Sequence, residues 1–238
     1  MVRPRPAHTH LTRWHAAGRR KLVLPTVKHL VWDWNGTLLN DLEPVVEATN
    51  AAFALVGGPV VDAGEHRRDF RRPVVDYYAY VLGRPIGPDE FARLDRVFHD
   101  TYRTRLVDCA LADDAIEAIN SWPGTQSLLS MFFHDELVPE VTRRGLVDRL
   151  ARIDGLRAAV GGGHKAEHLI EHLTALEVEG ADTVLIGDSI DDAHAAEEVG
   201  AGIVLYTGGF TDPAVLRATG RPVADTLVAA VKLAQALR

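Results

Sequence analysis

Short apolar runs alternate with stretches of helical spacing along most of this chain. Four runs are typical of buried strands, and three of them end at turn residues: 29–33, 127–132, 183–186 and 202–206. A weaker run covers residues 157–160. Between the runs, the spacing predicts helices over 113–122, 138–153, 166–176 and 193–199. Strands that alternate with helices indicate an α/β fold whose parallel sheet is covered on both faces, and such sheets bind ligands beyond the carboxyl ends of their strands.

The segment 41–108 interrupts this alternation, because its pattern predicts helices only. They cover residues 44–56, 74–82 and 89–106, with Gly-Pro-containing breaks between them. In the last of these, an apolar stripe at helical spacing predicts one buried face, formed by Phe91, Leu94, Phe98 and Tyr102. A helical insert that follows the first strand would lie over the carboxyl edge of the sheet, where it could cover a site.

Charge divides the chain unevenly. Residues 1–32 hold seven basic residues and no acidic one, so the remaining residues carry 19 basic and all 33 acidic side chains, a net charge of −14. We interpret residues 1–27 as a basic N-terminal extension, disordered or loosely docked, with nucleic-acid binding or targeting as the alternative. The acidic remainder does not suit a general nucleic-acid-binding protein.

Two further features of composition limit the class of protein. No run of 18 apolar residues occurs, so we expect no membrane span. The single cysteine, Cys109, forms no internal disulfide, which favours a reducing compartment and a cytoplasmic location. The sequence carries no signal for an oligomeric state.

The candidate chemistry begins where the first strand ends, at Asp33-Trp34-Asn35-Gly36-Thr37. A carboxylate at the end of a buried strand, followed by a turn that glycine permits, is held rigidly with its oxygens toward the open edge. A nucleophile or a metal ligand needs that placement. The segment resembles the first motif of the haloacid dehalogenase superfamily, Asp-x-Asp-Gly-Thr/Val, and the helical insert is similar to the cap of its phosphoglycolate phosphatase-like members.

Three further motifs of that superfamily follow in order. The second is a serine that closes a core strand, for which Ser130 fits better than Ser127. The third is Lys165 at the start of a helix, the only lysine between Lys28 and Lys232 in an arginine-rich chain. The fourth is Gly187-Asp188-Ser189-Ile190-Asp191-Asp192 after a strand. The resemblance implies a three-layer Rossmann-like core from residues 28–40 and 109–238, with 41–108 as the cap.

The resemblance also implies a mechanism for phosphate ester hydrolysis. Asp33 would attack phosphorus and form an aspartyl-phosphate, while Ser130 and Lys165 bind the phosphoryl oxygens beside Gly36 and Thr37. Asp33, the backbone carbonyl of Asn35 and Asp188 would hold Mg²⁺, which oxygen ligands favour over Zn²⁺. Asp192, or Asp191, would orient Lys165 or a metal-bound water.

Asn35 departs from the pattern. Phosphatases of the superfamily have a second aspartate there, which protonates the leaving oxygen and then activates water; an amide can do neither. Because such assistance contributes roughly 10²- to 10⁴-fold, we expect slow turnover of poor leaving groups unless another residue substitutes. The alternative is a catalytically weakened protein that binds phosphorylated ligands.

Other branches of the superfamily fit less well. Phosphonoacetaldehyde hydrolases have Asp-Trp-Ala-Gly-Thr, but they need a cap lysine, and 41–108 contains none. Haloacid dehalogenases, which attack carbon without Mg²⁺, have a tyrosine where this chain has Asn35.

Several other residues suggest chemistry more weakly. His168-x-x-Glu171-His172 matches an inverted zinc-protease pattern, but we interpret it as a surface helix. The glycines before Lys165 lack phosphate-loop spacing and indicate a turn that presents this lysine. His134 is a speculative substitute for the missing proton donor, and three tyrosines are interpreted as cap packing: Tyr77, Tyr78 and Tyr80.

A group of cap arginines remains: Arg67, Arg68, Arg71 and Arg72. A solvated basic loop is the simpler interpretation, but Arg71 and Arg72 are candidates for binding an anionic part of the substrate. The sequence therefore predicts a Mg²⁺-dependent hydrolase that acts on a small phosphorylated metabolite.

Overall fold

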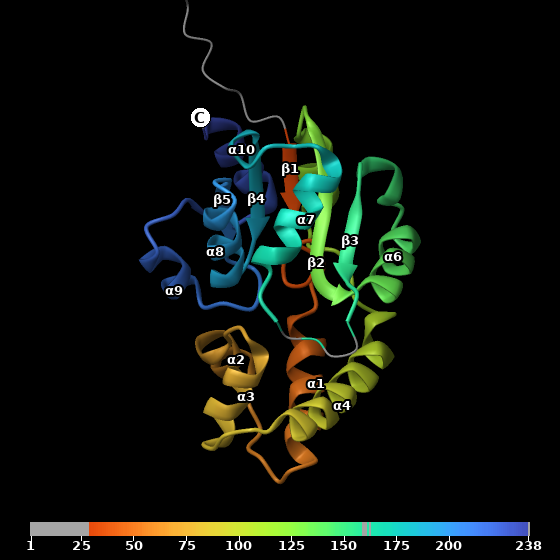
Figure 1. The fold of residues 1–238 in the computed structure, drawn as a ribbon, viewed down its shortest axis with the longest axis vertical. Coiled ribbons are helices and arrows are strands. Elements are labelled where there is room, and N and C mark those ends of the chain that lie inside the picture. The colour runs from red at the N-terminus through yellow and green to blue at the C-terminus, as the bar shows by residue number, and fades with distance from the viewer. Residues whose placement is uncertain (1–28, 159–160, 162, 238) are drawn as a thin grey trace, which may run out of the picture.

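The computed structural model describes residues 29–158, 161 and 163–237, and the predicted extension at 1–27 lies outside them (Figure 1). Within the described residues, a six-stranded sheet has the order β3-β2-β1-β4-β5-β6, with every neighbouring pair parallel. The strands are β1 (His29–Trp32), β2 (Thr125–Phe133), β3 (Ile153–Leu156), β4 (Thr183–Gly187), β5 (Gly202–Tyr206) and β6 (Val223–Ala224). The predicted α/β fold with a parallel sheet is confirmed.

Helices cover both faces of the sheet because alternate strand residues point to opposite sides. Leu30 and Trp32 pack with α5 (Ala115–Ser121), α6 (His134–Arg143) and α10 (Leu227–Ala236). Val31 packs on the other face, in a second cluster with α7 (Ala166–Leu176), α8 (Ile190–Glu198) and α9 (Pro213–Ala218). Two short 3₁₀ helices, η1 (Val147–Arg149) and η2 (Gly180–Asp182), precede β3 and β4. The middle of the sheet is thus buried on both sides.

The helical insert follows β1 and lies at the carboxyl end of the sheet (Figure 1). It consists of α1 (Leu42–Ala54), α2 (Ala63–Asp69), α3 (Val74–Leu82) and α4 (Pro88–Leu106). Its own apolar cluster includes Phe53, Tyr77, Tyr78 and Leu94. Of the predicted stripe on α4, Leu94 and Tyr102 are buried, while the two phenylalanines are partly buried.

Two sequence predictions were wrong. The helix predicted at 138–153 is α6, which ends at Arg143 before Gly145; this glycine has φ +70°, a left-handed conformation that ends helices. The strand predicted at 157–160 is β3, which pairs with Leu128 and Leu129 of β2 and ends at Leu156. Its short Ile-Asp-Gly-Leu sequence has too few apolar residues to be recognised without its neighbour. The sequence pattern also gave no prediction for α2, α9, β6 and α10.

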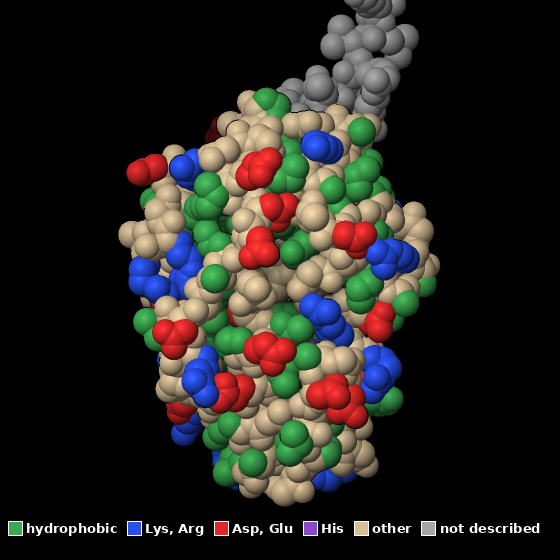
Figure 2. All heavy atoms as spheres, turned by 180° about the vertical axis from the view of Figure 1, so that it is seen from behind, with side chains coloured by type: hydrophobic (Ala, Val, Ile, Leu, Met, Phe, Trp, Pro, Cys, Tyr) green, Lys and Arg blue, Asp and Glu red, His purple; other side chains and the backbone are tan. Residues whose placement is uncertain are grey.

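Figure 2, which shows the side of the molecule opposite to that in Figure 1, has acidic and basic side chains interspersed over the surface. None of the helices in the described part of the chain combines the length and the apolar character that crossing a bilayer requires.

Candidate active site

Asp33 is the first residue after β1, and its position is fixed from both sides. Its backbone N–H donates to the carbonyl of Ile186 in β4 at 2.9 Å, and the residue is only 6% exposed. The chain turns at once through Gly36, whose φ of +71° favours glycine. The next residue, Thr37, has its hydroxyl 3.3 Å from Asp33 Oδ2 and 3.2 Å from Asp188 Oδ1. The turn therefore links the ends of β1 and β4 through Thr37 and Asp188, which are 151 residues apart in sequence.

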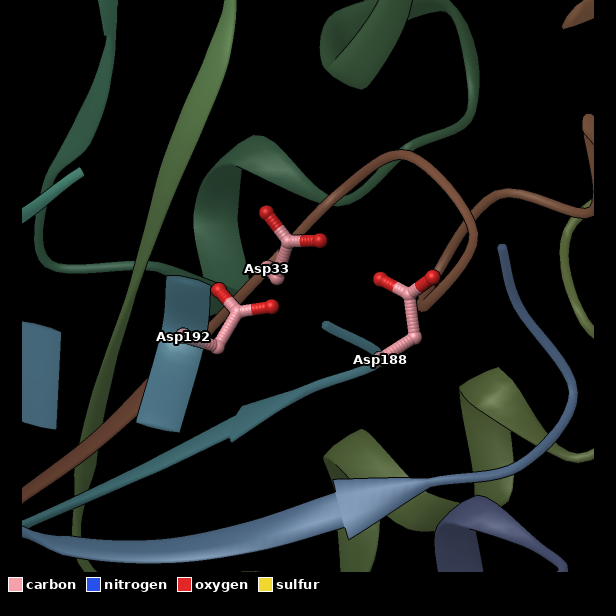
Figure 3. Close-up of side chains that lie close together, drawn as sticks. All are labelled: Asp33, Asp188 and Asp192. Carbon is pink, nitrogen blue, oxygen red and sulfur yellow. The ribbon is translucent and has the colours of Figure 1, made fainter. Parts of the chain in front are cut away.

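Three carboxylates meet at this edge of the sheet: Asp33 after β1, Asp188 after β4 and Asp192 in the first turn of α8 (Figure 3). Each offers an oxygen within 4.8 Å of the others, and all three are buried. Burial raises the pKa of Asp188 well above its ordinary value, and repulsion from Asp33 and Asp192 adds to this. Burial likewise raises the pKa of Asp33, although Lys165 opposes the shift. The site concentrates more negative charge than the nearby protein groups neutralise.

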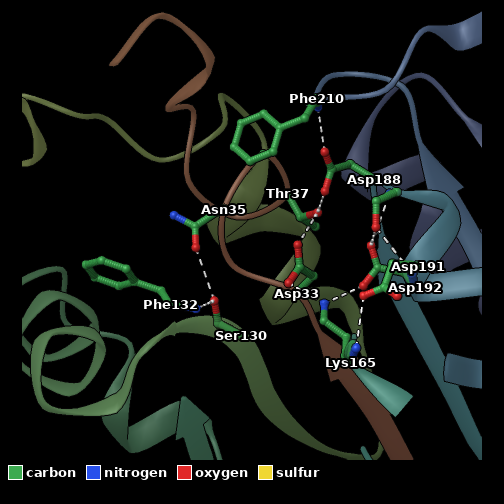
Figure 4. Close-up of polar contacts among 12 residues, drawn as sticks. Asp33, Asn35, Thr37, Ser130, Phe132, Lys165, Asp188, Asp191, Asp192 and Phe210 are labelled. Carbon is green, nitrogen blue, oxygen red and sulfur yellow. Dashed lines mark hydrogen bonds and ion pairs between the residues drawn. The ribbon is translucent and has the colours of Figure 1, made fainter. Parts of the chain in front are cut away.

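Lys165 supplies the cation among these carboxylates (Figure 4). Its Nζ lies 2.5 Å from Asp33 Oδ1 and also pairs with Asp192, while its backbone N–H donates to Asp191 Oδ2 at 3.0 Å. Burial alone would lower the pKa of Lys165, but Asp192 and Asp33 raise it above its ordinary value. Lys165 is therefore paired with Asp33 and Asp192 through its side chain and with Asp191 through its backbone.

Asn35 lies at the other side of the site and is held at both ends of its side chain. Its Oδ1 accepts from the hydroxyl of Ser130 at 3.1 Å, and its Nδ2 donates to Asp41 Oδ2 at 2.8 Å and to the hydroxyl of Tyr102 at 2.9 Å. Asp41 is fully buried and also accepts from the Gly36 N–H and the Tyr102 hydroxyl. Burial raises the pKa of Asp41 to about 6. Sequence reasoning missed Asp41 and Tyr102, since nothing in the pattern connects α4 with the first turn.

The loop after β5, which includes Gly209 and Phe210, contacts Asp188 and covers one side of the site. The backbone N–H of Phe210 donates to Asp188 Oδ2 at 2.5 Å. A Cβ on Gly209 would collide with Asp188 and with the backbone oxygen of Gly36, so glycine is needed at this close approach. The sequence signalled a turn at Gly208 and Gly209 but not its contact with the site.

These residues line a cavity of about 20 Å³ between the sheet edge and the insert, which we call the carboxylate cavity. Its lining holds the predicted residues Asp33, Asn35, Ser130, Lys165, Asp188, Asp192 and Arg72. Arg72 donates to the carbonyl of Gly163 at 3.1 Å and lies 3.9 Å from Asp191.

Arg71 is not placed in this cavity. It is exposed, its guanidinium lies 4.2 Å from the ring centroid of Tyr80, and its Nε donates to the carbonyl of Asp69. Tyr80 is itself 58% exposed, so the prediction that it packs inside the cap was wrong. Arg71 and Arg72 differ because consecutive residues of a non-helical segment point in different directions.

Other candidate residues lie elsewhere. His134 contacts the Gly155 N–H and the Arg157 guanidinium, away from the carboxylate cavity. His172 is buried, and its two ring nitrogens contact Ser127 Oγ and Asp154 Oδ2, each at 2.7 Å. Both nitrogens are therefore occupied. The interpretation of this segment as a surface helix was wrong at His172, which is 1% exposed because its ring faces β2 and contacts Ser127.

The donor set of the carboxylate cavity fits a hard divalent cation. Three buried carboxylates face a single ammonium group, which leaves excess negative charge in a water-poor site. Carboxylate and carbonyl oxygens are the ligands that Mg²⁺ prefers in proteins. Among the described residues, this is the only group of three or more histidine, cysteine or acidic side chains with metal-binding proximity.

Comparison with known proteins gives the same result for the fold. Residues 161–230, which include Lys165 and the acidic motif, match the family described as HAD-hydrolase-like. A phosphoglycolate phosphatase from Chromobacterium violaceum is 24% identical over 207 residues, covering 82% of this chain and 91% of that protein.

Solved structures resemble the whole described fold. A haloacid dehalogenase-like hydrolase from Streptococcus pneumoniae has a TM-score of 0.74 at 18% identity, over 87% of this chain and 98% of its own. A predicted phosphatase from Clostridium acetobutylicum has a TM-score of 0.75 at 13% identity, with the same coverage. At these identities, the likeness concerns the arrangement of core and insert.

Proposed function

We propose that the chain is a haloacid dehalogenase-like hydrolase, and that it is a cytoplasmic phosphatase that cleaves small phosphate monoesters through Asp33. The family match of residues 161–230, the phosphoglycolate phosphatase relative and the shared fold support this proposal. The observation that carries this proposal is the pairing of a buried carboxylate with Lys165 at the open end of the sheet. Arg72 and Ser130 line the same cavity. The guanidinium of Arg72 supplies donors for phosphoryl oxygens, whereas the Ser130 hydroxyl, which donates to Asn35 Oδ1, would turn from Asn35 to do the same. Nucleophile, cation and donors thus occupy one small cavity.

In the proposed reaction, a carboxylate oxygen of Asp33 forms a bond to phosphorus while the bond from phosphorus to the leaving oxygen breaks. Lys165 offsets the charge shared by Asp33 and the phosphoryl group. Water then attacks the aspartyl-phosphate, which releases inorganic phosphate and frees Asp33. Asn35 lines the cavity but cannot supply the proton that the leaving oxygen takes up.

Asp33, Asp188 and the backbone carbonyl of Asn35 are the residues that would hold Mg²⁺. When bound, the ion neutralises charge between the nucleophile and the phosphoryl group. Asp192 is committed to Lys165 and to the hydroxyl of Ser189, so we assign it a positioning role.

The test is a phosphate-release screen with Mg²⁺, using the wild type and Asp33→Asn. We expect release by the wild type and none by the variant, because an amide is not a nucleophile toward phosphorus. The variant keeps the size of the side chain, so unchanged thermal unfolding serves as the folding control. Release that persists in Asp33→Asn would contradict the assignment of the nucleophile.

A second candidate function is supported by Asn35 itself. A protein without the second carboxylate, but with the complete phosphate cavity, suits binding of phosphorylated ligands with little turnover. Calorimetric binding by wild type, without phosphate release from any substrate, would favour this second function.

A further inference from the structure

A second cavity, of about 90 Å³, adjoins the carboxylate cavity on the side of the insert. We call it the aromatic cavity, because the side chains of several aromatic residues line it, among them Phe70, Tyr77, Tyr78, Phe98 and Phe132. The two cavities share five lining residues: Asn35, Phe70, Arg72, Met131 and Phe210. A phosphate ester bound at Asp33 would therefore extend its organic part past Asn35 into the aromatic cavity.

The charges around the aromatic cavity do not suit an anionic group. Apart from histidines, its charged lining residues are Arg72 and Asp95. Arg72 also lines the carboxylate cavity and lies 3.9 Å from Asp191, so its charge serves the phosphate end. Asp95 lies 3.5 Å from His99 Nε2 and accepts from the Gly161 N–H. A carboxylate that enters the aromatic cavity meets Asp95 without a cation of its own.

Two histidines that line the aromatic cavity each have a buried ring nitrogen without a hydrogen-bond partner among the described residues. His66 is 1% exposed, with Nδ1 at 3.0 Å from the hydroxyl of Tyr77 and Nε2 without a partner among the described residues. His99 has a buried Nδ1 that likewise has no partner there. A buried polar atom that lacks a hydrogen bond is costly, so a ligand that supplies one gains affinity. Burial, with a smaller contribution from Arg67, lowers the pKa of His66 to about 4, so this ring is neutral at physiological pH.

We propose that the aromatic cavity binds the leaving group of the substrate, and that this group is compact, uncharged and bears a hydroxyl or carbonyl for His66 or His99. This inference rests on the proposed phosphatase function. The volume limits the size, because an apolar cavity of about 150 Å³ holds benzene and this one is smaller. The preferred substrates are thus short hydroxyalkyl phosphates rather than phosphorylated carboxylic acids such as phosphoglycolate.

The test compares two matched series of substrates with two to four carbons: ω-hydroxyalkyl phosphates and ω-carboxyalkyl phosphates, with the plain alkyl phosphates as reference. We expect kcat/KM for the best hydroxyalkyl phosphate to exceed that of the matched carboxylate by about tenfold or more, the equivalent of one hydrogen bond. His66→Phe and His99→Phe should each be measured, and at least one should reduce the ratio of hydroxyalkyl to alkyl phosphate turnover. His66→Gln, which keeps a polar atom, should retain part of this ratio, and His194→Phe on the exposed side of α8 is the matched control.

Calorimetric binding of both series to Asp33→Asn in the presence of Mg²⁺ separates the two proposals. Preference for the carboxylates, or a ratio that neither phenylalanine variant changes, overturns the inference and leaves the phosphatase function intact. Absence of phosphate release from every substrate, including p-nitrophenyl phosphate, overturns the proposed function. If Asp33→Asn then still binds hydroxyalkyl phosphates more tightly than carboxyalkyl phosphates, the aromatic cavity binds the organic part of a phosphorylated ligand, and only its role as a leaving-group site is overturned.

Discussion

Replacing Asn35 by aspartate restores the carboxylate expected of phosphatases that this chain resembles. We nevertheless expect this single change to destabilise the folded protein at neutral pH. Asn35 Nδ2 donates to Asp41 Oδ2 at 2.8 Å, so Asn35→Asp removes this donor and places two carboxylates in contact. Two unit charges about 4 Å apart repel by roughly 4 kcal/mol at an effective dielectric constant near 20. Such a pair cannot be doubly ionised at that cost, so it retains a proton.

The effect of pH on stability follows from the number of protons bound by the folded and the unfolded protein. Carboxyl groups whose pKa is raised in the folded state hold protons that the unfolded state has lost, so stability falls as pH rises from about 4 through the raised pKa. In the wild type, burial already raises the pKa of Asp41 to about 6. We therefore expect Asn35→Asp to lose roughly 2–4 kcal/mol of unfolding free energy at pH 8 and much less at pH 5.

The assay is urea unfolding at pH 5, 6.5 and 8 for the wild type, Asn35→Asp, Asp41→Asn and the exchange variant that carries both changes. The exchange variant restores one amide beside one carboxylate, so it should recover at least half of the loss at pH 8. It should also cleave poor leaving groups faster than the wild type, within the roughly 10²- to 10⁴-fold range of proton transfer. The reasoning is refuted if Asn35→Asp is equally stable at pH 5 and pH 8, or if the exchange variant is no more stable than Asn35→Asp.

Three further predictions concern the rest of the site. Lys165→Met leaves two buried carboxylates without their cation, so this variant should lose about 3–5 kcal/mol of unfolding free energy. Thermal unfolding with and without Mg²⁺ measures the loss. If Mg²⁺ restores none of the stability, a cation site at the carboxylates is contradicted. Gly209→Ala forces Asp188 to move and should reduce phosphate release roughly 10²-fold, whereas Gly87→Ala, with nothing within 4 Å of its Cβ, should change little; equal activity of the two variants would contradict the close approach. Burial lowers the pKa of His66 to about 4, so the folded protein gains this proton only near pH 4, whereas the unfolded chain gains it near pH 6.5. The unfolding free energy should therefore fall by about 3 kcal/mol between pH 6.5 and pH 4. Urea unfolding should show a smaller fall for His66→Gln, and an equal fall would exclude His66 as the cause.

Many of the helices and strands could be predicted from the sequence, because the spacing of apolar residues is a local property of the chain. The predicted bounds of α3, α7 and β5 agree with the structure to the residue, since each has strong apolar spacing and a clear end. The pattern failed at β3, whose four residues form a strand through pairing with β2. An edge strand of this kind is stabilised mainly by its neighbour, so its own sequence carries little signal.

The sequence by itself determined the order of the candidate groups: a carboxylate after the first strand, then a serine, a lone lysine at the start of a helix and an acidic motif after a strand. The prediction that Ser130 closes its strand was wrong, because β2 continues to Phe133, which pairs with Leu156 of β3. Parallel strands bring such ends to one edge, which is why Asp33, Lys165 and Asp188 could be expected together. Only the tertiary structure decided which neighbours they have. The contact of Asp41 and Tyr102 with Asn35, the separation of Arg72 from Arg71 and the aromatic cavity depend on how the insert packs against the sheet. Packing between distant segments is set by the complementary shape of whole surfaces, which no local pattern of residues encodes.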